Sequence, residues 1–220
     1  MPRKSEEYIV IGLGRFGSSL ALKLTELGQA VLAVDRSRDL VQAYSDELTQ
    51  TAALDATDED ALRALGVEEF ATAIVAIGSD FESNILITAL LKELGVRTVI
   101  CKALNQRQRA ILLRVGADHV VLPEHEAGER LAHQLLIPQL VDRIEIEPGV
   151  SISELQCPDL LQGHRLSELD LERRFGISVL AIKGVRTTLL PDANTLLAEG
   201  DALVVLGPDS AIVQLHAWAP

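Results

Sequence analysis

The chain has 220 residues, of which 48% are apolar and 24% charged, a balance that is typical of a folded globular protein. Its net charge of −12 and its aromatic content of 3% provide neither a basic face for phosphate backbones nor ring platforms for bases, so we expect no nucleic acid partner. Its apolar runs are shorter than the roughly 18–20 residues that cross a bilayer, and the N-terminus lacks a signal-peptide pattern, which predicts a cytoplasmic protein.

Short apolar runs alternate with amphipathic helical windows from Tyr8 to Leu122. This alternation is typical of α/β proteins in which helices cover both faces of a parallel sheet. Glycines after the windows, such as Gly28 and Gly66, provide the left-handed residue that ends a helix. Six strands are expected, at Tyr8–Ile11, Ala30–Val34, Gln50–Ala53, Thr72–Ile77, Thr98–Cys101 and His119–Leu122. Six such strands predict a Rossmann-like, doubly wound parallel sheet.

A small α+β domain is expected to follow a crossover helix over residues 123–138. The run Ile144–Leu155 alternates apolar and polar residues, which predicts a half-exposed strand. The further expected elements are a helix over residues 166–175, strands over 177–182, 187–190 and 202–206, and a helix over 209–216. We therefore place the nucleotide-binding domain at residues 1–141 and the second domain at residues 142–220.

The pattern Gly12-Leu13-Gly14-Arg15-Phe16-Gly17 lies between the first expected strand and the first expected helix. In this context G-x-G-x-x-G predicts a phosphate-binding turn. Gly12 permits the tight turn, Gly14 lets phosphate approach the backbone, and Gly17 lets the helix pack on the strand. The free amides and the dipole of the helix that includes Phe16 would then bind the anion. The alternative is that the glycines serve packing alone.

Asp35 ends the second expected strand, 23 positions after Gly12. A carboxylate at about this spacing binds the ribose hydroxyls of an adenosine and repels a 2′-phosphate, which disfavours NADP. Arg36 either partly offsets this repulsion of a 2′-phosphate or is a solvated surface charge. Two groups at later strand ends are expected either to contact adenine or ribose or to form plain turns: Asp55 with Ala56 and Thr57, and Ala76 with Ile77 and Gly78.

Two charged residues have a functional and a structural interpretation. Arg15 lies within the turn, where a guanidinium either binds the outer phosphates of a polyphosphate or turns outward to solvent. Glu124 either stabilises the start of a helix or binds a divalent cation. The five histidines and two cysteines form no zinc-binding pattern, and Cys101 and Cys157 are expected to be inert buried thiols. No acid or base for an oxidoreductase is visible, so an enzyme is not expected.

Six segments together resemble the Ktr/Trk potassium-uptake regulators, KtrA-like proteins with a regulator-of-potassium-conductance (RCK) domain. The resemblance covers nearly the whole chain, and the part beyond Ile144 is similar to the usual C-terminal companion domain. The segments are Tyr8–Gly17, Val31–Asp35, Val75–Gly78, Lys102–Asn105, Gly116–Asp118 and Leu122–Glu124.

The resemblance implies a peripheral, non-catalytic subunit on the cytosolic face of a potassium-translocating membrane protein, where homodimers form an octameric ring. ATP and ADP would compete for the Rossmann cleft. Arg15 would reach the γ-phosphate, Asp35 the ribose, and Glu124 a cation such as Mg²⁺ near the phosphates; Lys102 joins the nucleotide site on the same resemblance. Cyclic di-AMP is an additional candidate ligand of the C-terminal domain.

Two other functions stay open at this point. An NADH-binding Trk-type regulator would bind NADH tightly with little preference between ATP and ADP. An NAD-dependent oxidoreductase would show substrate-dependent changes in nicotinamide absorbance. The candidate nucleotide-binding residues are Gly12, Gly14, Arg15, Phe16, Gly17, Asp35, Arg36, Asp55, Ala56, Ala76, Ile77, Gly78 and Lys102, and Glu124 is the candidate metal ligand.

Overall fold

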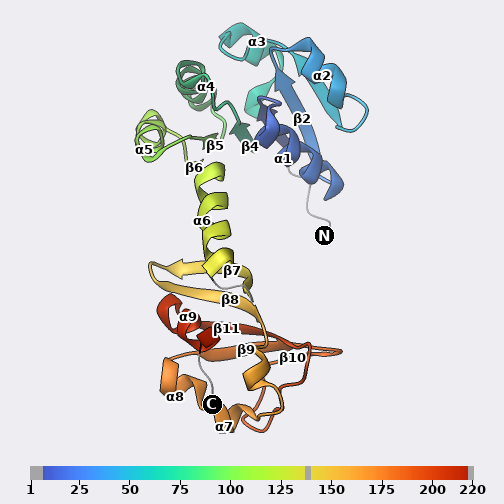
Figure 1. Ribbon diagram of the computed structural model, residues 1–220. Coiled ribbons are helices and arrows are strands. Elements are labelled where there is room, and N and C mark those ends of the chain that lie inside the picture. The colour runs from blue at the N-terminus through green and yellow to red at the C-terminus, as the bar shows by residue number, and fades with distance from the viewer. Residues whose placement is uncertain (1–6, 137–139, 218–220) are drawn as a thin grey trace. The chain divides into compact units, whose positions relative to one another are not determined.

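A computed structural model describes residues 7–136 and 140–217 (Figure 1). Its contacts divide the chain into two compact units, Met1–Glu126 and Ala127–Pro220. The first six residues, which form most of the segment judged not to be a signal peptide, lie outside the described residues. The domain boundary between residues 141 and 142 stays a prediction.

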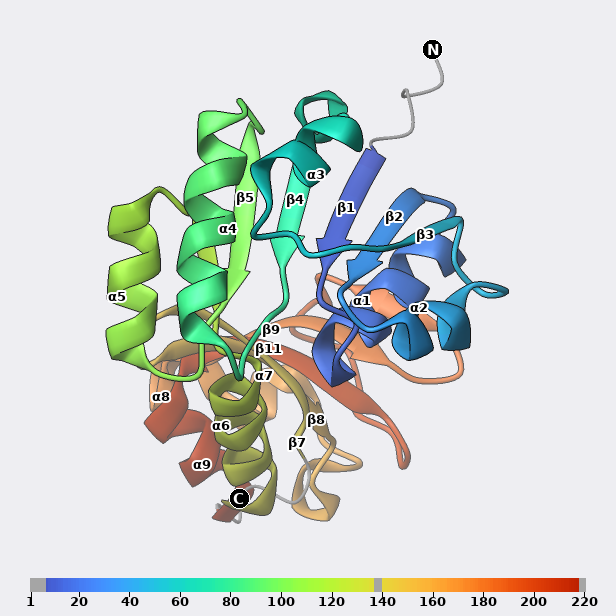
Figure 2. The ribbon, with the colours of Figure 1, turned by 90° about the horizontal axis from the view of Figure 1, so that it is seen from above.

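The first unit contains the predicted parallel sheet of six strands, in the order β3-β2-β1-β4-β5-β6. Figure 2 shows β5, β4, β1 and β2 following one another across this sheet. The strands are β1 (Glu7–Ile11), β2 (Ala30–Asp35), β3 (Gln50–Ala53), β4 (Thr72–Val75), β5 (Thr98–Lys102) and β6 (His119–Val121). The helical segments are α1 (Arg15–Glu26), α2 (Arg38–Tyr44), α3 (Glu59–Ala64), η1 (Val67–Glu69), α4 (Phe81–Glu93) and α5 (Gln106–Val115), with α6 (Pro123–Leu136) running into the second unit. The Rossmann-like prediction is confirmed.

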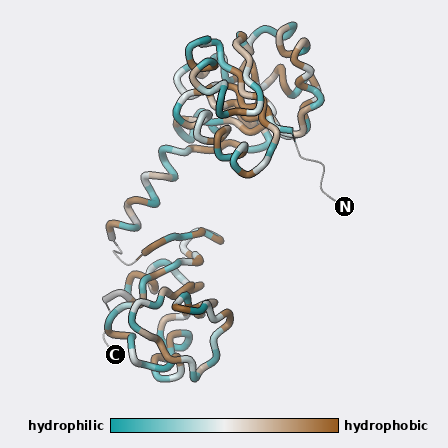
Figure 3. The backbone as a smooth tube through the Cα atoms, turned by 90° about the vertical axis from the view of Figure 1, so that its right-hand side faces the viewer, coloured by the Kyte–Doolittle hydropathy of each residue, from teal (hydrophilic) through white to brown (hydrophobic). Residues whose placement is uncertain are grey.

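Alternate residues of each strand pack on opposite faces of this sheet, as the pleat requires. Ile9 and Ile11 join one buried cluster with residues of α3, α4 and α5. Val10, between them, joins a second cluster with residues of α1 and α2. Both faces are therefore covered, which explains why the strands are continuously apolar. In Figure 3 the segments coloured brown, for hydrophobic residues, lie mainly in the interior of this unit.

The second unit is built on an antiparallel sheet in the order β10-β9-β11-β8-β7. Its strands are β7 (Leu140–Glu147), β8 (Val150–Gln156), β9 (Ser178–Lys183), β10 (Thr187–Leu189) and β11 (Ala202–Pro208). Its helical segments are η2 (Asp159–Leu161), α7 (Leu166–Leu169), α8 (Leu171–Phe175) and α9 (Asp209–Ala217). The small α+β domain predicted from the sequence is confirmed.

Three sequence predictions need correction. The single strand expected over Ile144–Leu155 is a hairpin of β7 and β8, because Gly149 turns the chain with a φ of 85°. The helix expected over residues 166–175 is two short helices, separated by Asp170, whose φ is 47°. The strand expected over Thr72–Ile77 ends at Val75. Two of the expected site residues therefore follow β4 instead of lying within it.

Candidate functional site

The glycine turn joins the carboxyl end of β1 to α1, next to the point where the order of the sheet reverses. The N–H of Gly12 donates to the carbonyl of Val34, 2.7 Å away, and Gly12 has a φ of 101° that favours glycine. A Cβ on Gly17 would lie only 1.9 Å from the carbonyl oxygen of Gly12. These two glycines are therefore required by the close approach of helix and turn.

Gly14 has a different environment from the other two glycines of the turn. It is exposed, its φ of −65° is open to any residue, and a Cβ built on it would meet no atom within 4 Å. The fold alone therefore does not require glycine here. A ligand that approaches the backbone does, because a side chain would occupy its place. Packing alone, the alternative explanation of the three glycines, accounts for Gly12 and Gly17 but not for Gly14.

The N-terminus of α1 carries no side-chain cap, whereas the next four α-helices are capped. Gly14 is the N-cap of α1, and the first turn holds no acidic residue. Helices α2, α3, α4 and α5 are capped by Ser37, Asp58, Asp80 and Asn105. The first amides of α1 are thus left for an anion, which the dipole of the helix also favours.

Asp35, the last residue of β2, binds the turn from the neighbouring strand. Its Oδ2 accepts the N–H of Leu13 at 2.7 Å, and its Oδ1 accepts the N–H of Ser37 at 2.8 Å. Each carboxylate oxygen keeps a second lone pair for a ribose hydroxyl. Asp35 therefore has a structural role in the turn that the sequence did not predict, in addition to its predicted ribose contact.

The turn opens into a cleft of about 310 Å³ at the carboxyl ends of the strands, where open α/β sheets bind ligands. Of the candidate site residues, nine line this cleft: Gly12, Gly14, Asp35, Arg36, Asp55, Ala56, Ala76, Ile77 and Gly78. Sequence reasoning missed four polar residues of the lining: Ser37, Ser79, Asp80 and Ser83. Direct contact of these residues with a ligand stays a prediction.

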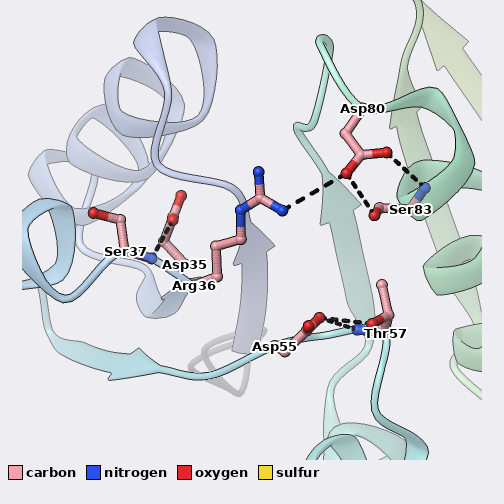
Figure 4. A network of polar contacts seen from close by, with 7 residues as sticks. All are labelled: Asp35, Arg36, Ser37, Asp55, Thr57, Asp80 and Ser83. Carbon is pink, nitrogen blue, oxygen red and sulfur yellow. Dashed lines mark hydrogen bonds and ion pairs between the residues drawn. The ribbon is translucent and has the colours of Figure 1, made fainter.

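Polar side chains of the cleft are held in place by local hydrogen bonds (Figure 4). Oδ1 of Asp55 accepts both the N–H and the hydroxyl of Thr57, and these bonds lower the pKa of Asp55. The backbone N–H and then the hydroxyl of Ser83 lower the pKa of Asp80 in the same way. Arg36 forms an ion pair with Asp80 at 3.7 Å. The local pattern of an aspartate three residues before Ser83 was a signal for a helix cap.

The other five candidate residues lie in the same unit but outside the cleft lining: Arg15, Phe16, Gly17, Lys102 and Glu124. Lys102 donates to Glu124 at 2.6 Å, and its ammonium lies 5.8 Å from the centre of the Phe16 ring. This ammonium would be 3.4 Å from a Cβ on Gly78, which does line the cleft. Lys102 holds the pKa of Glu124 below its usual range, with a smaller contribution from Arg15. Arg15 is exposed at the start of α1.

Glu124 alone does not form a metal site. Within the described residues, no group of three or more His, Cys, Asp or Glu side chains is placed to hold an ion. Magnesium is commonly bound by one or two carboxylates together with phosphate oxygens and water. The single carboxylate of Glu124 therefore fits a cation that arrives with a polyphosphate, and does not fit a metal that the protein holds by itself.

Asn84 is a positioning residue that the sequence analysis did not select. Its side chain is buried, with 1% exposed, and its amide donates to the carbonyl of Ile77 at 2.7 Å and of Lys102 at 2.9 Å. Thr88 donates to the backbone carbonyl of Asn84 at 2.6 Å. Asn84 thus fixes the backbone beyond β4 against the end of β5. A polar residue within the apolar window of α4 was the available signal.

Both cysteines are buried, as predicted. Burial raises the pKa of Cys101 to about 11 and that of Cys157 to about 11. Because the thiolate is the reactive form, the two thiols are inert near neutral pH. The interpretation of these residues as packing groups is confirmed.

The turn, the uncapped helix and the carboxylate of Asp35 define a nucleotide-binding domain of the Rossmann class. Residues 8–123 match the TrkA-N domain and residues 158–219 match the TrkA-C domain. The chain is 38% identical to the Ktr system potassium uptake protein C of Bacillus subtilis, over 92% of each chain. It belongs to the family of Ktr and Trk potassium uptake proteins, so the predicted resemblance is confirmed.

Two solved structures show the same fold. The match to the RCK domain of GsuK covers 100% of this chain and 49% of the GsuK chain, with a TM-score of 0.66 and 18% identity. The NAD(P)-binding domain of an exopolyphosphatase-related protein from Archaeoglobus fulgidus is 30% identical, with a TM-score of 0.53, over 59% of this chain and 97% of that one. No helix in the described part of this chain is long and apolar enough to cross a membrane.

Proposed function

We propose that this chain is a non-enzymatic regulatory subunit of a potassium uptake system, and that the first domain distinguishes ATP from ADP. The exposed Gly14 carries this proposal, because its lack of a side chain is explained by a phosphate and not by packing. Membership of the Ktr and Trk family supports the link to potassium. A ligand biases a two-state subunit only by its different affinity for the two states, so the contrast between ATP and ADP would be the signal.

The charges around the cleft support one orientation of the bound nucleotide. Asp35 at the end of β2 is placed for the ribose, while the free amides of α1 are placed for the inner phosphates. Arg15 and Lys102 bring two cations toward the phosphate side, where a third phosphate extends beyond the amides. Arg15 is the better candidate for the γ-phosphate, because Lys102 is already paired with Glu124.

Arg15→Ala tests the proposed function directly. We expect ATP binding to weaken by about 1.5–3 kcal/mol, the scale of a charged hydrogen bond, with a much smaller loss for ADP. The preference for ATP should then collapse, and ATP should no longer change potassium uptake. Calorimetric titration with both nucleotides and a transport assay at saturating nucleotide measure the two effects.

Arg107→Ala is the matched control, since Arg107 is likewise an exposed arginine in the first turn of a helix, but in α5 and not in the helix of the glycine turn. It should bind both nucleotides as the parent does. Equal losses of ATP and ADP affinity in Arg15→Ala, with the response to ATP retained, would show that another group binds the γ-phosphate.

For Glu124 we propose a role as the protein ligand of a divalent cation that enters with ATP. Glu124→Gln should abolish the strengthening of ATP binding by magnesium and leave ADP binding nearly unchanged, since the amide keeps the size but not the charge of the carboxylate. Glu82→Gln is the control, because Glu82 is also the second residue of a helix, whereas Glu124 is the residue that accepts from Lys102. Titration of each variant with ATP, with and without magnesium, measures this effect. If magnesium strengthens ATP binding in Glu124→Gln as much as in the parent, Glu124 is only a partner of Lys102.

For the assembly we propose homodimers in an octameric ring, peripheral on the cytoplasmic face of an integral membrane subunit that translocates potassium. Family membership supports this arrangement. On the same ground, cyclic di-AMP is a candidate ligand of the second domain.

NAD(H) is the second candidate ligand of the first domain. The relative from Archaeoglobus fulgidus, which is 30% identical, is described as an NAD(P)-binding domain. Titration of the purified protein with ATP, ADP, NADH and cyclic di-AMP separates the alternatives. Tight NADH binding with equal ATP and ADP affinities would identify an NADH-sensing regulator, and turnover of NAD with a substrate would identify an oxidoreductase.

A further inference from the structure

An ion pair spans the cleft at its ribose side. Arg36 follows β2 and Asp80 precedes α4, beyond β4, so the two residues belong to the two neighbours of β1 in the sheet. The guanidinium of Arg36 nevertheless reaches to 3.7 Å from the carboxylate of Asp80 (Figure 4). Both residues line the cleft.

Asp80 is the fixed partner of this pair. Its Oδ1 accepts the N–H of Ser83 at 3.1 Å, and its Oδ2 accepts the hydroxyl of Ser83 at 2.8 Å. These bonds hold the carboxylate at the start of α4 and keep it charged at neutral pH. The side chain of Arg36 is 75% exposed, and its guanidinium lies within ion-pair distance of Asp80. Asp55 interacts with Arg36 only as a more distant charge, so Asp80 is the nearer attraction on the guanidinium.

The cleft lining otherwise disfavours negative charge at the ribose. It contains three carboxylates, from Asp35, Asp55 and Asp80, and one guanidinium, from Arg36. A phosphate on the 2′-hydroxyl would approach Asp35 and would need a cation to balance that repulsion. Arg36 is the adjacent residue, but its guanidinium points away from Asp35 and toward Asp80 (Figure 4).

We propose that Asp80 sets the selectivity of the cleft for an unmodified ribose, by holding Arg36 away from the position of a 2′-phosphate. This inference rests on the proposed function, because it requires that the adenosine of a nucleotide binds at Asp35. Asp35 repels a 2′-phosphate directly, and Asp80 keeps Arg36 from balancing that repulsion. Arg36 therefore does not confer binding of 2′-phosphorylated ligands.

The test compares AMP with adenosine 2′,5′-bisphosphate by calorimetry at low salt. The parent should bind AMP more tightly. In Asp80→Asn the amide oxygen can still accept the N–H of Ser83, so the cap is kept while the charge that attracts Arg36 is lost. We expect binding of the bisphosphate to improve about fivefold, the upper range for an exposed ion pair, and AMP affinity to stay within about twofold.

Two further variants separate the release of Arg36 from the loss of a negative charge. Asp80→Asn combined with Arg36→Ala should return the bisphosphate affinity to the parental level. Glu82→Gln removes another carboxylate from the first turn of α4, outside the cleft lining, without breaking the pair, and it should change the ratio of the two affinities less than twofold.

The outcomes also separate this inference from the proposed function. An unchanged affinity ratio in Asp80→Asn, or a gain that persists in the double variant, would overturn the role of Asp80 even if the parent binds AMP, ADP and ATP. A parent that binds none of these nucleotides would instead overturn the proposed function.

Discussion

Asp35→Ala is expected to weaken AMP, ADP, ATP and NADH alike, by about 2–4 kcal/mol. The reason is that two charge-assisted hydrogen bonds to ribose hydroxyls are lost, and the ribose is common to all four ligands. The loss should lie toward the upper value, because Asp35 also accepts the N–H of Leu13 and so holds the turn that receives the phosphates. Calorimetric titration with each ligand measures the effect.

The structural role of Asp35 adds a second readout. Without ligand, Asp35→Ala should also lower the unfolding temperature, because the amides of Leu13 and Ser37 lose their acceptor. Asp39→Ala is the matched control: it removes the same charge from the exposed first turn of α2, should leave binding unchanged and should cost less than about 1 kcal/mol in stability. Equal affinities for all four ligands in Asp35→Ala and the parent would place the nucleotide elsewhere.

The backbone of the site was predictable from the sequence, because its signals are local. A buried strand, three glycines at fixed spacing and a helix predict the turn, and the spacing from Gly12 to Asp35 predicts the neighbouring strand end. The parallel order of the sheet then brings these segments together at one edge. The hairpin of β7 and β8 was missed because the alternation of apolar and polar residues continues through its turn at Gly149.

Side-chain pairs between distant segments were not predictable. Arg36 and Asp80 are far apart in sequence, and either residue alone is an ordinary surface charge. The pairing of Lys102 with Glu124 depends equally on the ends of separate strands. Lys102 was selected by resemblance alone. The structure shows that only 11% of its side chain is exposed and that its ammonium lies beside Gly78 and over the ring of Phe16.

An added methyl group is expected to have opposite consequences at two glycines of the turn, Gly17 and Gly14. Gly17→Ala should destabilise the folded protein by at least about 3 kcal/mol, since the new Cβ would lie 1.9 Å from the carbonyl oxygen of Gly12. That oxygen has little room to move, because the N–H of Leu13, in the same planar peptide group, donates to Asp35. The higher helix propensity of alanine, about 1 kcal/mol, is too small to offset this clash. Thermal unfolding should show a decrease of roughly 6–12 °C.

Gly14→Ala should instead leave the protein folded and weaken its binding of nucleotides. Its Cβ meets no atom within 4 Å, so the cost in stability should stay below about 1 kcal/mol, the scale of a changed N-cap. The methyl group would occupy the approach of the phosphate to the backbone, and ADP and ATP affinities should both fall at least about tenfold. Unfolding without ligand and titration with both nucleotides measure the two properties separately. Parental affinity in Gly14→Ala would mean that phosphate does not approach this backbone, and parental stability in Gly17→Ala would mean that α1 does not pack against the turn as closely as the structure has it.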